Sequence, residues 1–332
     1  MRFICFAALA AIPLLAADAT KISGPYTHEN LAIYLVHDPS LVHGQSRTTR
    51  TYMTLQEAME QRKVIVYETS DVNTLEIANV SRDIDVYIQS GDIVKGGKQD
   101  RVIKDDIILQ SMSGKTPLRV FCVEQGRWTQ RGSESAGQFE SSRQSIAGKK
   151  MKMAVRSDAD QHAVWDRVAE VQRDLSKNLN APVQSAESRS SFQLTLETKK
   201  VRETTQGFER ALEPLLAKNP DAVGYIAAVN GKVTGADVYA SHALFAKLWP
   251  KLLASAAVEA MQSERAAVAP AAPTMDAVKS VLAPADDEKA GPATKVNART
   301  EVQKKESKAG VQFETKDAAL PGGFVHRSYV AK

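Results

Sequence analysis

The residues whose types and spacing suit ligand binding are concentrated in one stretch, Gly91 to Arg101. Lys95, Lys98 and Arg101 surround the pair Gly96-Gly97. Glycines let backbone N–H groups approach a ligand closely, and turns of such groups form concave anion-binding sites. Nearby cations add charge-assisted hydrogen bonds to a phosphate or carboxylate. The stretch therefore predicts an anion-binding loop, and the alternative is a tight strand-to-strand turn with solvated lysines.

This loop lacks the two common nucleotide-binding signatures. Gly97-Lys98 is followed by Gln99, where a Walker A loop has Ser or Thr, and the G-x-G-x-x-G spacing of the dinucleotide fingerprint is missing. Gln99 instead contributes an amide, which we include among the predicted ligand-binding residues.

A second motif, Glu124 to Trp128, ends the most strand-like segment of the middle region. Arg127 could bind a phosphate or carboxylate in bidentate fashion, and Trp128 could stack on a base or sugar. In the alternative, Glu124 and Arg127 form an internal ion pair and Trp128 covers the core. The sequence leaves both interpretations open.

The candidates for reaction chemistry are weaker. Asp92, Asp100 and Glu124 are possible acid–base groups of a hydrolase, but no recognisable spacing connects them. Cys122 alternates with apolar neighbours and has no histidine nearby, so we expect it to be buried and unreactive. The six histidines form no H-x-x-x-H pair, so no zinc site is predicted. The sequence identifies neither a catalytic set nor a cofactor.

Composition limits the class of protein. The 332 residues are 43% hydrophobic and 25% charged, which suits a globular domain with a sizeable core. The net charge is only +4, and Lys and Arg are scattered along the chain. We therefore expect no nucleic-acid partner, and the sequence indicates no particular protein partner.

The first 19 residues have the pattern of a secretory signal peptide. Arg2 precedes the apolar run Phe3 to Ala16, and Ala17-Asp18-Ala19 matches the A-x-A cleavage pattern. The alternative is an uncleaved N-terminal anchor. Cleavage predicts an exported protein, periplasmic or extracellular, which does not contact the membrane afterwards.

Between residues 20 and 264, short strands and helices predict a single α+β domain with a mostly antiparallel or mixed sheet. Thr54 is expected to cap a helix that ends near Arg62, with Glu57 at the capping-box position. Strands are predicted at 31–36, 64–68, 84–88 and 117–123. Residues 129–150 are predicted to form a long loop, either a lid or an ordinary surface excursion.

The second half of this domain alternates helices with a hairpin. We expect helices from Ser157 or Asp158 to Leu175, from Thr205, and from Ser241 to about Ser263, and a strand at Phe192 to Leu196. Asn230-Gly231, the preferred type I′ dipeptide, predicts a hairpin between 222–229 and 232–238.

The C-terminal part has a different composition. Residues 265–308 are rich in Ala, Pro, Lys, Glu and Asp, which predicts a disordered linker. Residues 309–332 contain two strand-like segments, and the sequence does not decide whether they join the main sheet or form a loose tail.

The motifs at Gly91 to Arg101 and Val123 to Trp128, with the segment Gly224 to Trp249, resemble a prokaryotic domain family. Its name records association with ADP-ribosylglycohydrolase and rhodanese–phosphatase domains. The resemblance covers about residues 24–263 and implies, by association, a connection to ADP-ribose or NAD metabolism. It supplies no catalytic residue set.

Three functions are compatible with these observations. The favoured one is a binding module for an anionic ligand, including ADP-ribose- or nucleotide-like molecules. The alternatives are a hydrolase of a phosphoanhydride or glycosidic bond in such a ligand, and an envelope domain that binds proteins or has a structural role. The first two predict that Arg127 and Gln99 line a pocket, and the third predicts that both are used in internal hydrogen bonds.

Overall fold

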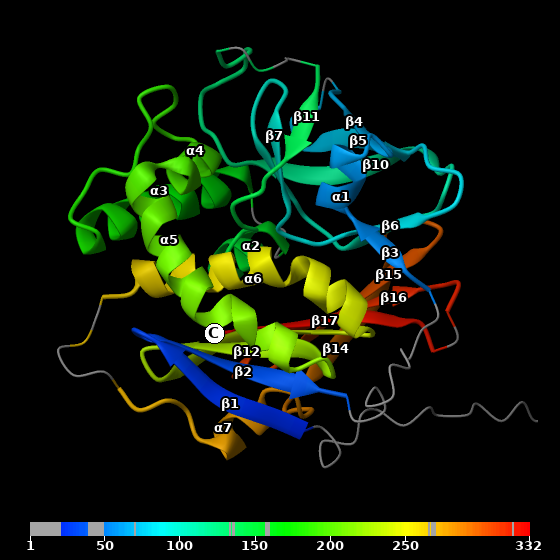
Figure 1. Ribbon diagram of the computed structural model, residues 1–332. Coiled ribbons are helices and arrows are strands. Elements are labelled where there is room, and N and C mark those ends of the chain that lie inside the picture. Colours follow the sequence, from blue (N-terminus) through cyan, green and yellow to red (C-terminus); the bar gives the residue numbers. More distant parts are fainter. Residues whose placement is uncertain are drawn as a thin grey trace, which may run out of the picture.

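The structure is a computed structural model that describes residues 21–38, 50–69, 71–132, 134, 137–156, 160–264, 266, 270–320 and 322–332. The predicted signal peptide, residues 1–19, lies outside these ranges. Helices separate one large sheet from two smaller ones (Figure 1). The predicted α+β class, with mixed sheets and several helices in one domain, is confirmed.

The large sheet joins the two ends of the described chain. Every pair of neighbouring strands in it is antiparallel. Its strands, in spatial order, are β1 (Lys21–His28), β2 (Leu31–His37), β12 (Ala222–Val229), β13 (Lys232–Tyr239), β17 (Phe324–Ala331), β16 (Gly310–Asp317), β15 (Thr300–Glu306) and β14 (Lys289–Lys295).

The amino-acid pattern accounts for the strands β2 and β12 and for the hairpin that joins β12 to β13. All residues of β2 and β12 are buried, which accounts for their continuous apolar runs rather than an alternating pattern. The predicted hairpin is confirmed: Asn230 and Gly231 have φ of 50° and 74°, the positive values that a type I′ turn requires.

Two smaller sheets form the other half of the molecule and have a core of their own. One contains β11 (Phe139–Ser141), β7 (Ile93–Gly96), β8 (Arg101–Ile103), β10 (Gly114–Cys122), β5 (Thr74–Asn79) and β4 (Val64–Tyr67). The other contains β3 (Tyr52–Thr54), β6 (Asp85–Ile88) and β9 (Ile107–Leu109). Between them, α1 (Leu55–Glu60) begins at the predicted capping box of Thr54 and Glu57.

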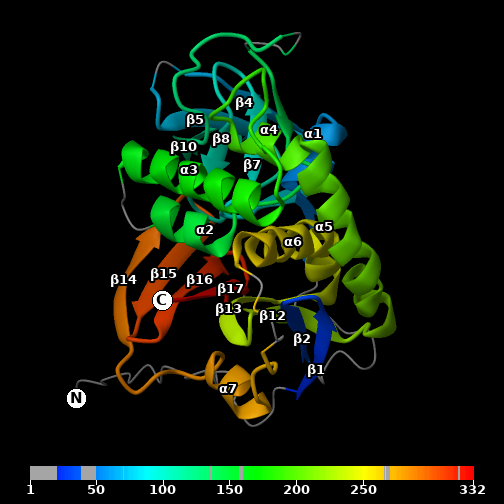
Figure 2. The ribbon, with the colours of Figure 1, turned by 90° about the vertical axis from the view of Figure 1, so that its left-hand side faces the viewer.

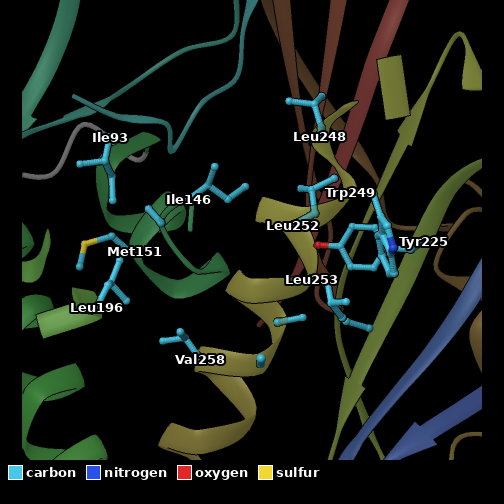
Figure 3. Packing of buried hydrophobic residues seen from close by; sticks show 14 of the residues in the cluster. Ile93, Ile146, Met151, Leu196, Tyr225, Leu248, Trp249, Leu252, Leu253 and Val258 are labelled. Atoms are coloured by element: carbon cyan, nitrogen blue, oxygen red, sulfur yellow. The ribbon is translucent and has the colours of Figure 1, made fainter. Parts of the chain in front are cut away.

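Helix α6 (His242–Gln262) lies between the large sheet and the smaller sheets in both views (Figures 1 and 2). Most of its residues are buried, and Figure 3 shows its side chains packed toward both sides. Tyr225 of β12 stacks on Phe245 with ring centroids 6.3 Å apart. The remaining helices are α2 (Lys149–Arg156), α3 (Gln161–Asn178), α4 (Phe192–Glu197), α5 (Lys199–Leu212), the 3-10 helix η3 (Glu213–Lys218) and α7 (Met275–Ser280).

Two local predictions in the middle of the chain were wrong. Phe192 to Leu196 is helix α4, not a strand, and the side chain of Ser191 caps it through the Leu194 N–H. All five of these residues are buried, so their apolar–polar alternation does not mark an exposed face. The predicted loop at 129–150 contains strand β11, and helix α2 begins at Lys149.

The predicted disordered linker was also wrong, because three of its segments form regular secondary structure. Residues 275–280 form α7, and residues 289–295 and 300–306 form β14 and β15. The polar composition misled the prediction because β14 is an exposed edge strand whose stability comes from backbone pairing with β15. Helix α7 lies on the face of the large sheet opposite α6 (Figure 2), and its Val278 packs in one cluster with residues of β2 and β12. The two C-terminal strands join the main sheet as β16 and β17.

Candidate functional site

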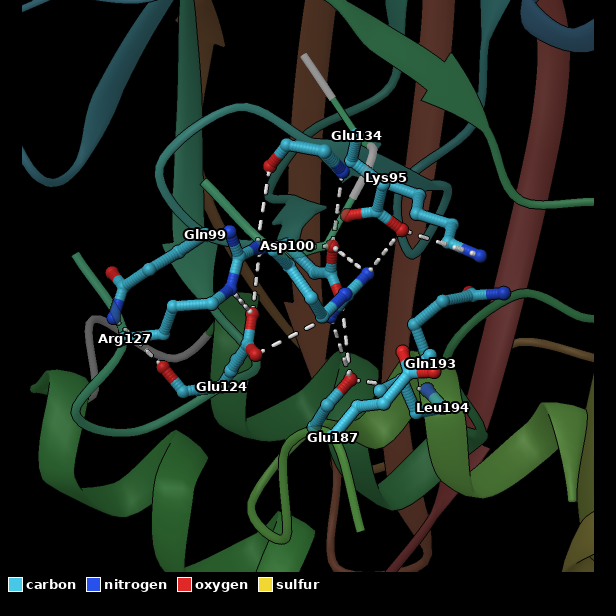
Figure 4. A network of polar contacts seen from close by, with 12 residues as sticks. Lys95, Gln99, Asp100, Glu124, Arg127, Glu134, Glu187, Gln193 and Leu194 are labelled. Carbon is cyan, nitrogen blue, oxygen red and sulfur yellow. Dashed lines mark hydrogen bonds and ion pairs between the residues drawn. The ribbon is translucent and has the colours of Figure 1, made fainter. Parts of the chain in front are cut away.

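The two predicted motifs meet in one buried ion network, shown in Figure 4. Asp100 and Glu124 are both 0% exposed. Arg127 Nε donates to Glu124 Oε2 at 2.6 Å, and Arg131 Nη1 donates to Asp100 Oδ2 at 2.8 Å. Arg131 Nη1 also lies 3.3 Å from Glu124 Oε1. We call these four residues the motif network; its two carboxylates are neutralised by two guanidinium groups.

The glycine pair forms the turn from β7 to β8. Gly96 and Gly97 have φ of 111° and 55°, and a Cβ at Gly97 would lie 2.2 Å from the Phe139 ring. Only glycine is compatible with that backbone and that contact. The Gly96 N–H donates to Asp100 Oδ1 at 3.0 Å, and the Gly97 N–H donates to Gln138 O at 3.1 Å. Both N–H groups are therefore used within the protein.

Three other predicted ligand-binding side chains also have internal partners. Gln99 Nε2 donates to the Glu124 carbonyl at 2.9 Å. Arg127 also donates to the carbonyls of Gly97 and Thr129, at 3.1 and 2.7 Å. Lys95 Nζ lies 2.8 Å from Glu197 Oε1. These contacts fix the loop in place, as the alternative interpretation predicts, in which the motifs form a tight turn and an internal ion pair.

Two cationic side chains, Lys98 and Arg101, lie against the ring of Trp128. Lys98 Nζ and Arg101 Cζ lie 5.3 and 5.6 Å from the centre of the indole ring, within cation–π range. Trp128 is 42% exposed, whereas Arg101 is completely buried. The guanidinium of Arg101 has no hydrogen-bond acceptor in the described part of the chain, and its ion pair with Glu68 is long, at 3.6 Å.

The weak catalytic candidates are all engaged. Asp92 is buried and accepts a hydrogen bond from Lys251 Nζ at 2.6 Å. Asp100 and Glu124 belong to the motif network. A hydrolytic acid–base pair needs access to its substrate, and these three carboxylates have almost none.

An open hollow of about 660 Å³ lies against the motif network. Residues 125–127, 129–132 and 187–190 line it, and Trp128 does not. Arg127 and Arg131 line it, together with Arg189 from the segment between α3 and α4. Arg127 thus lines a concave surface while its donors are satisfied internally, and Gln99 does not line it. Arg189 is exposed and has no ion-pair partner within the described ranges.

Sequence analysis missed a second buried cluster, formed by His326, Asp106 and Asp237. His326 Nδ1 lies 2.7 Å from Asp106 Oδ2, and its Nε2 lies 3.2 Å from Asp237 Oδ1. Lys149 Nζ lies 3.2 Å from Asp237 Oδ2. We call these four residues the histidine cluster.

Long-range pairing explains why the histidine cluster was missed. Asp106 and His326 are 220 positions apart in the chain, and no local pattern connects them. One signal was available: Lys149, Lys152 and Arg156 follow helical spacing, and all three are buried on α2. The predicted loop at 129–150 includes only Lys149 of these three residues, and no element is predicted for 151–156.

The structure also describes the one free cysteine of the described chain and its surroundings. Cys122 is buried, as expected, and burial raises the pKa of its thiol to about 11. Among the described residues, no group of three His, Cys, Asp or Glu side chains could hold a metal ion. In the same ranges, no helix has the length and apolar character needed to cross a bilayer.

The fold and the motif network define an α+β domain in which a sealed charge network holds a glycine turn beside an open hollow. The family model for the ARG and rhodanese-phosphatase-superfamily-associated protein domain matches residues 19–330, and the chain belongs to this family. The match extends beyond the resemblance at 24–263 and includes the C-terminal strands of the large sheet. No curated protein and no solved structure matches the chain.

Proposed function

We propose that this member of the family is a binding module for a small anionic ligand, held in the hollow beside the motif network. The observation that carries the proposal is the set of three arginines in its wall, Arg127, Arg131 and Arg189. Arginine forms bidentate hydrogen bonds with phosphate and carboxylate groups, which makes such a wall suitable for an anion.

The arginines do not contribute equally. Arg127 and the two terminal nitrogens of Arg131 already serve Asp100 and Glu124. The Nε–H of Arg131 is buried without an acceptor among the described residues. An unsatisfied buried donor costs about 1–3 kcal/mol, and an anion oxygen would recover this cost if the Arg131 side chain turned its Nε toward the hollow. Arg189 supplies a cation that forms no ion pair within the described ranges, although the carboxylate of Glu187 also lines the hollow.

Trp128 favours an aromatic or sugar-containing anion. Its indole is 42% exposed and does not line the hollow itself, so a ligand that reaches beyond the hollow could stack a base or sugar on this ring. The family's association with ADP-ribosylglycohydrolase domains agrees with an ADP-ribose- or nucleotide-like ligand. Binding is favoured over hydrolysis because Asp100 and Glu124 are sealed behind the guanidinium groups.

Isothermal titration calorimetry of the full chain with ADP-ribose, NAD and inorganic phosphate tests this function. We expect ADP-ribose to bind, and Arg189→Ala to weaken binding about tenfold, as the loss of one charge-assisted contact does. Arg82→Ala is the matched control, since Arg82 is also exposed but lies outside the hollow. The proposal fails if none of the three compounds binds, or if both variants bind as the parent chain does.

We also propose that residues 1–19 direct export and are then removed. The cleavage pattern Ala17-Asp18-Ala19 supports this, as does the family match beginning at residue 19. Mass spectrometry of protein from the periplasmic and extracellular fractions should find a chain beginning at Thr20. An intact chain confined to the cytoplasm would contradict export.

A further inference from the structure

A second concave site has no lining residue in common with the hollow beside the motif network. It is a cavity of about 220 Å³ bounded by α2, α3, α6 and the strands β13 and β17. Its apolar wall includes Val171, Phe192, Val229, Val233 and Val330. For scale, an engineered apolar cavity of about 150 Å³ accommodates a benzene molecule. The cavity is therefore large enough for one small side chain, such as that of leucine.

Most of the cationic side chains that line this cavity already form ion pairs within the protein. Lys149 Nζ pairs with Asp237, and its backbone N–H donates to Glu259. The other paired cations of the wall are Arg167, which contacts Glu170, and Lys332, which contacts Glu306.

Three charged side chains of the wall have no ion-pair partner within the described ranges: Lys150, Asp174 and Glu259, whose Oε1 accepts the Lys149 backbone N–H and whose Oε2 has no hydrogen-bond partner. Lys150 of α2 and Asp174 of α3 both line the cavity, and neither forms an ion pair or side-chain hydrogen bond within the described ranges. They do not pair with each other either, so their charged groups are separated. An apolar space whose wall holds one free cation and carboxylates without a cation is complementary to a molecule with a carboxylate, an ammonium group and an apolar part.

We propose that this cavity binds a zwitterionic small molecule with an apolar side chain, an apolar α-amino acid. Its carboxylate faces Lys150, its ammonium faces Asp174, and its side chain packs among the valines and Phe192. The apolar contacts supply most of the affinity, because partly exposed ion pairs are weak. The two charges select the zwitterion over molecules that have one charged group.

The test is a set of matched probes titrated into the full chain and followed by calorimetry or NMR. L-leucine carries all three features. 4-Methylpentanoate lacks the ammonium group, 3-methylbutylamine lacks the carboxylate, and glycine lacks the side chain. We expect leucine to bind about threefold or more tightly than either singly charged probe, and glycine not to bind measurably.

The variants address each contact separately. Asp174→Asn should weaken leucine binding about threefold but leave 4-methylpentanoate binding unchanged. Lys150→Gln should also weaken leucine binding about threefold but leave 3-methylbutylamine binding unchanged. Asp166→Asn, exposed on the same helix, and Lys200→Gln, exposed on α5, are the controls. Val233→Trp fills the cavity and should abolish binding.

Several results would overturn the proposal. It fails if leucine does not bind, or if 4-methylpentanoate or 3-methylbutylamine binds as tightly as leucine. It also fails if folded Val233→Trp binds leucine normally. Lys150 is exposed and Asp174 half-buried, so these two variants remain informative if Val233→Trp does not fold. The ADP-ribose titration is independent, because Arg189 is outside this cavity.

Discussion

His326 lies between two buried aspartates, with Nδ1 2.7 Å from Asp106 and Nε2 3.2 Å from Asp237. Only a protonated imidazole can donate from both nitrogens. Asp106 immediately precedes β9 of the three-stranded sheet, whereas Asp237 and His326 belong to β13 and β17 of the large sheet. The contact therefore connects two sheets across the interior of the molecule.

We predict that this contact makes stability depend on pH. Burial lowers the pKa of His326, but Asp106 and Asp237 more than offset this effect and raise it above 6.5. A raised pKa stabilises the fold below the unfolded value of about 6.5, and this contribution is lost as pH rises through the folded pKa.

Asp106 contributes in the acid range. Burial raises the pKa of Asp106, but the interaction with His326 outweighs burial and holds this pKa well below its usual range. Asp106 therefore stabilises the fold above about pH 4 and loses this effect in acid.

Urea unfolding at pH 5.5 and at higher pH values measures the effect. The free energy of unfolding of the parent chain should decrease above the folded pKa of His326, and His326→Gln should show no such decrease. The variant should also lose about 3–5 kcal/mol at pH 5.5, because it leaves buried carboxylates without their cation. Equal pH slopes for the two chains would disprove the ionic role.

Gly97→Ala is predicted to destabilise the turn between β7 and β8. The new Cβ would clash with the Phe139 ring at a backbone φ of 55°. Clash and strain together should cost about 1–3 kcal/mol. Gly207→Ala is the control of opposite sign, since it lies inside α5 with open space around its Cβ and should stabilise the chain by up to about 1 kcal/mol. Denaturant unfolding of both variants measures these changes, and an unaffected Gly97→Ala would contradict the clash.

Arg131→Met is predicted to be among the most destabilising substitutions in the motif network. It leaves Asp100 without its main cation in a fully buried site, which costs about 3–5 kcal/mol. Adding Asp100→Asn should restore part of the loss, because the remaining group is then neutral. Thermal or urea unfolding of the single and double variants measures this coupling. Simple additivity of the two losses would argue against a charge network.

The segment from α7 to β15 is predicted to resist trypsin despite its lysines. Residues 300–306 pair with β16 along their whole length, so cleavage there requires local unfolding. Limited proteolysis followed by mass spectrometry should find slow cutting at Lys304 and Lys305. Rapid cutting at these sites in the folded chain would instead support the linker predicted from composition.

Local features of the fold could be predicted because their causes lie within a few residues. The capping box of Thr54 and Glu57 and the type I′ turn at Asn230-Gly231 are set by neighbouring side chains and backbone angles. The α+β class and the family resemblance also follow from short motifs. The burial of Cys122 follows from its apolar strand neighbours.

By itself, then, the sequence determined which segments contain turns, caps and apolar strands, and it located the two motifs. Only the tertiary structure decided that Arg127 and Gln99 donate inward, that β14 and β15 extend the large sheet, and that His326 meets Asp106. The physical reason is that these outcomes depend on contacts between distant residues. A polar side chain is complementary to ligand and protein alike, and the groups that surround it in the fold determine which of the two it binds.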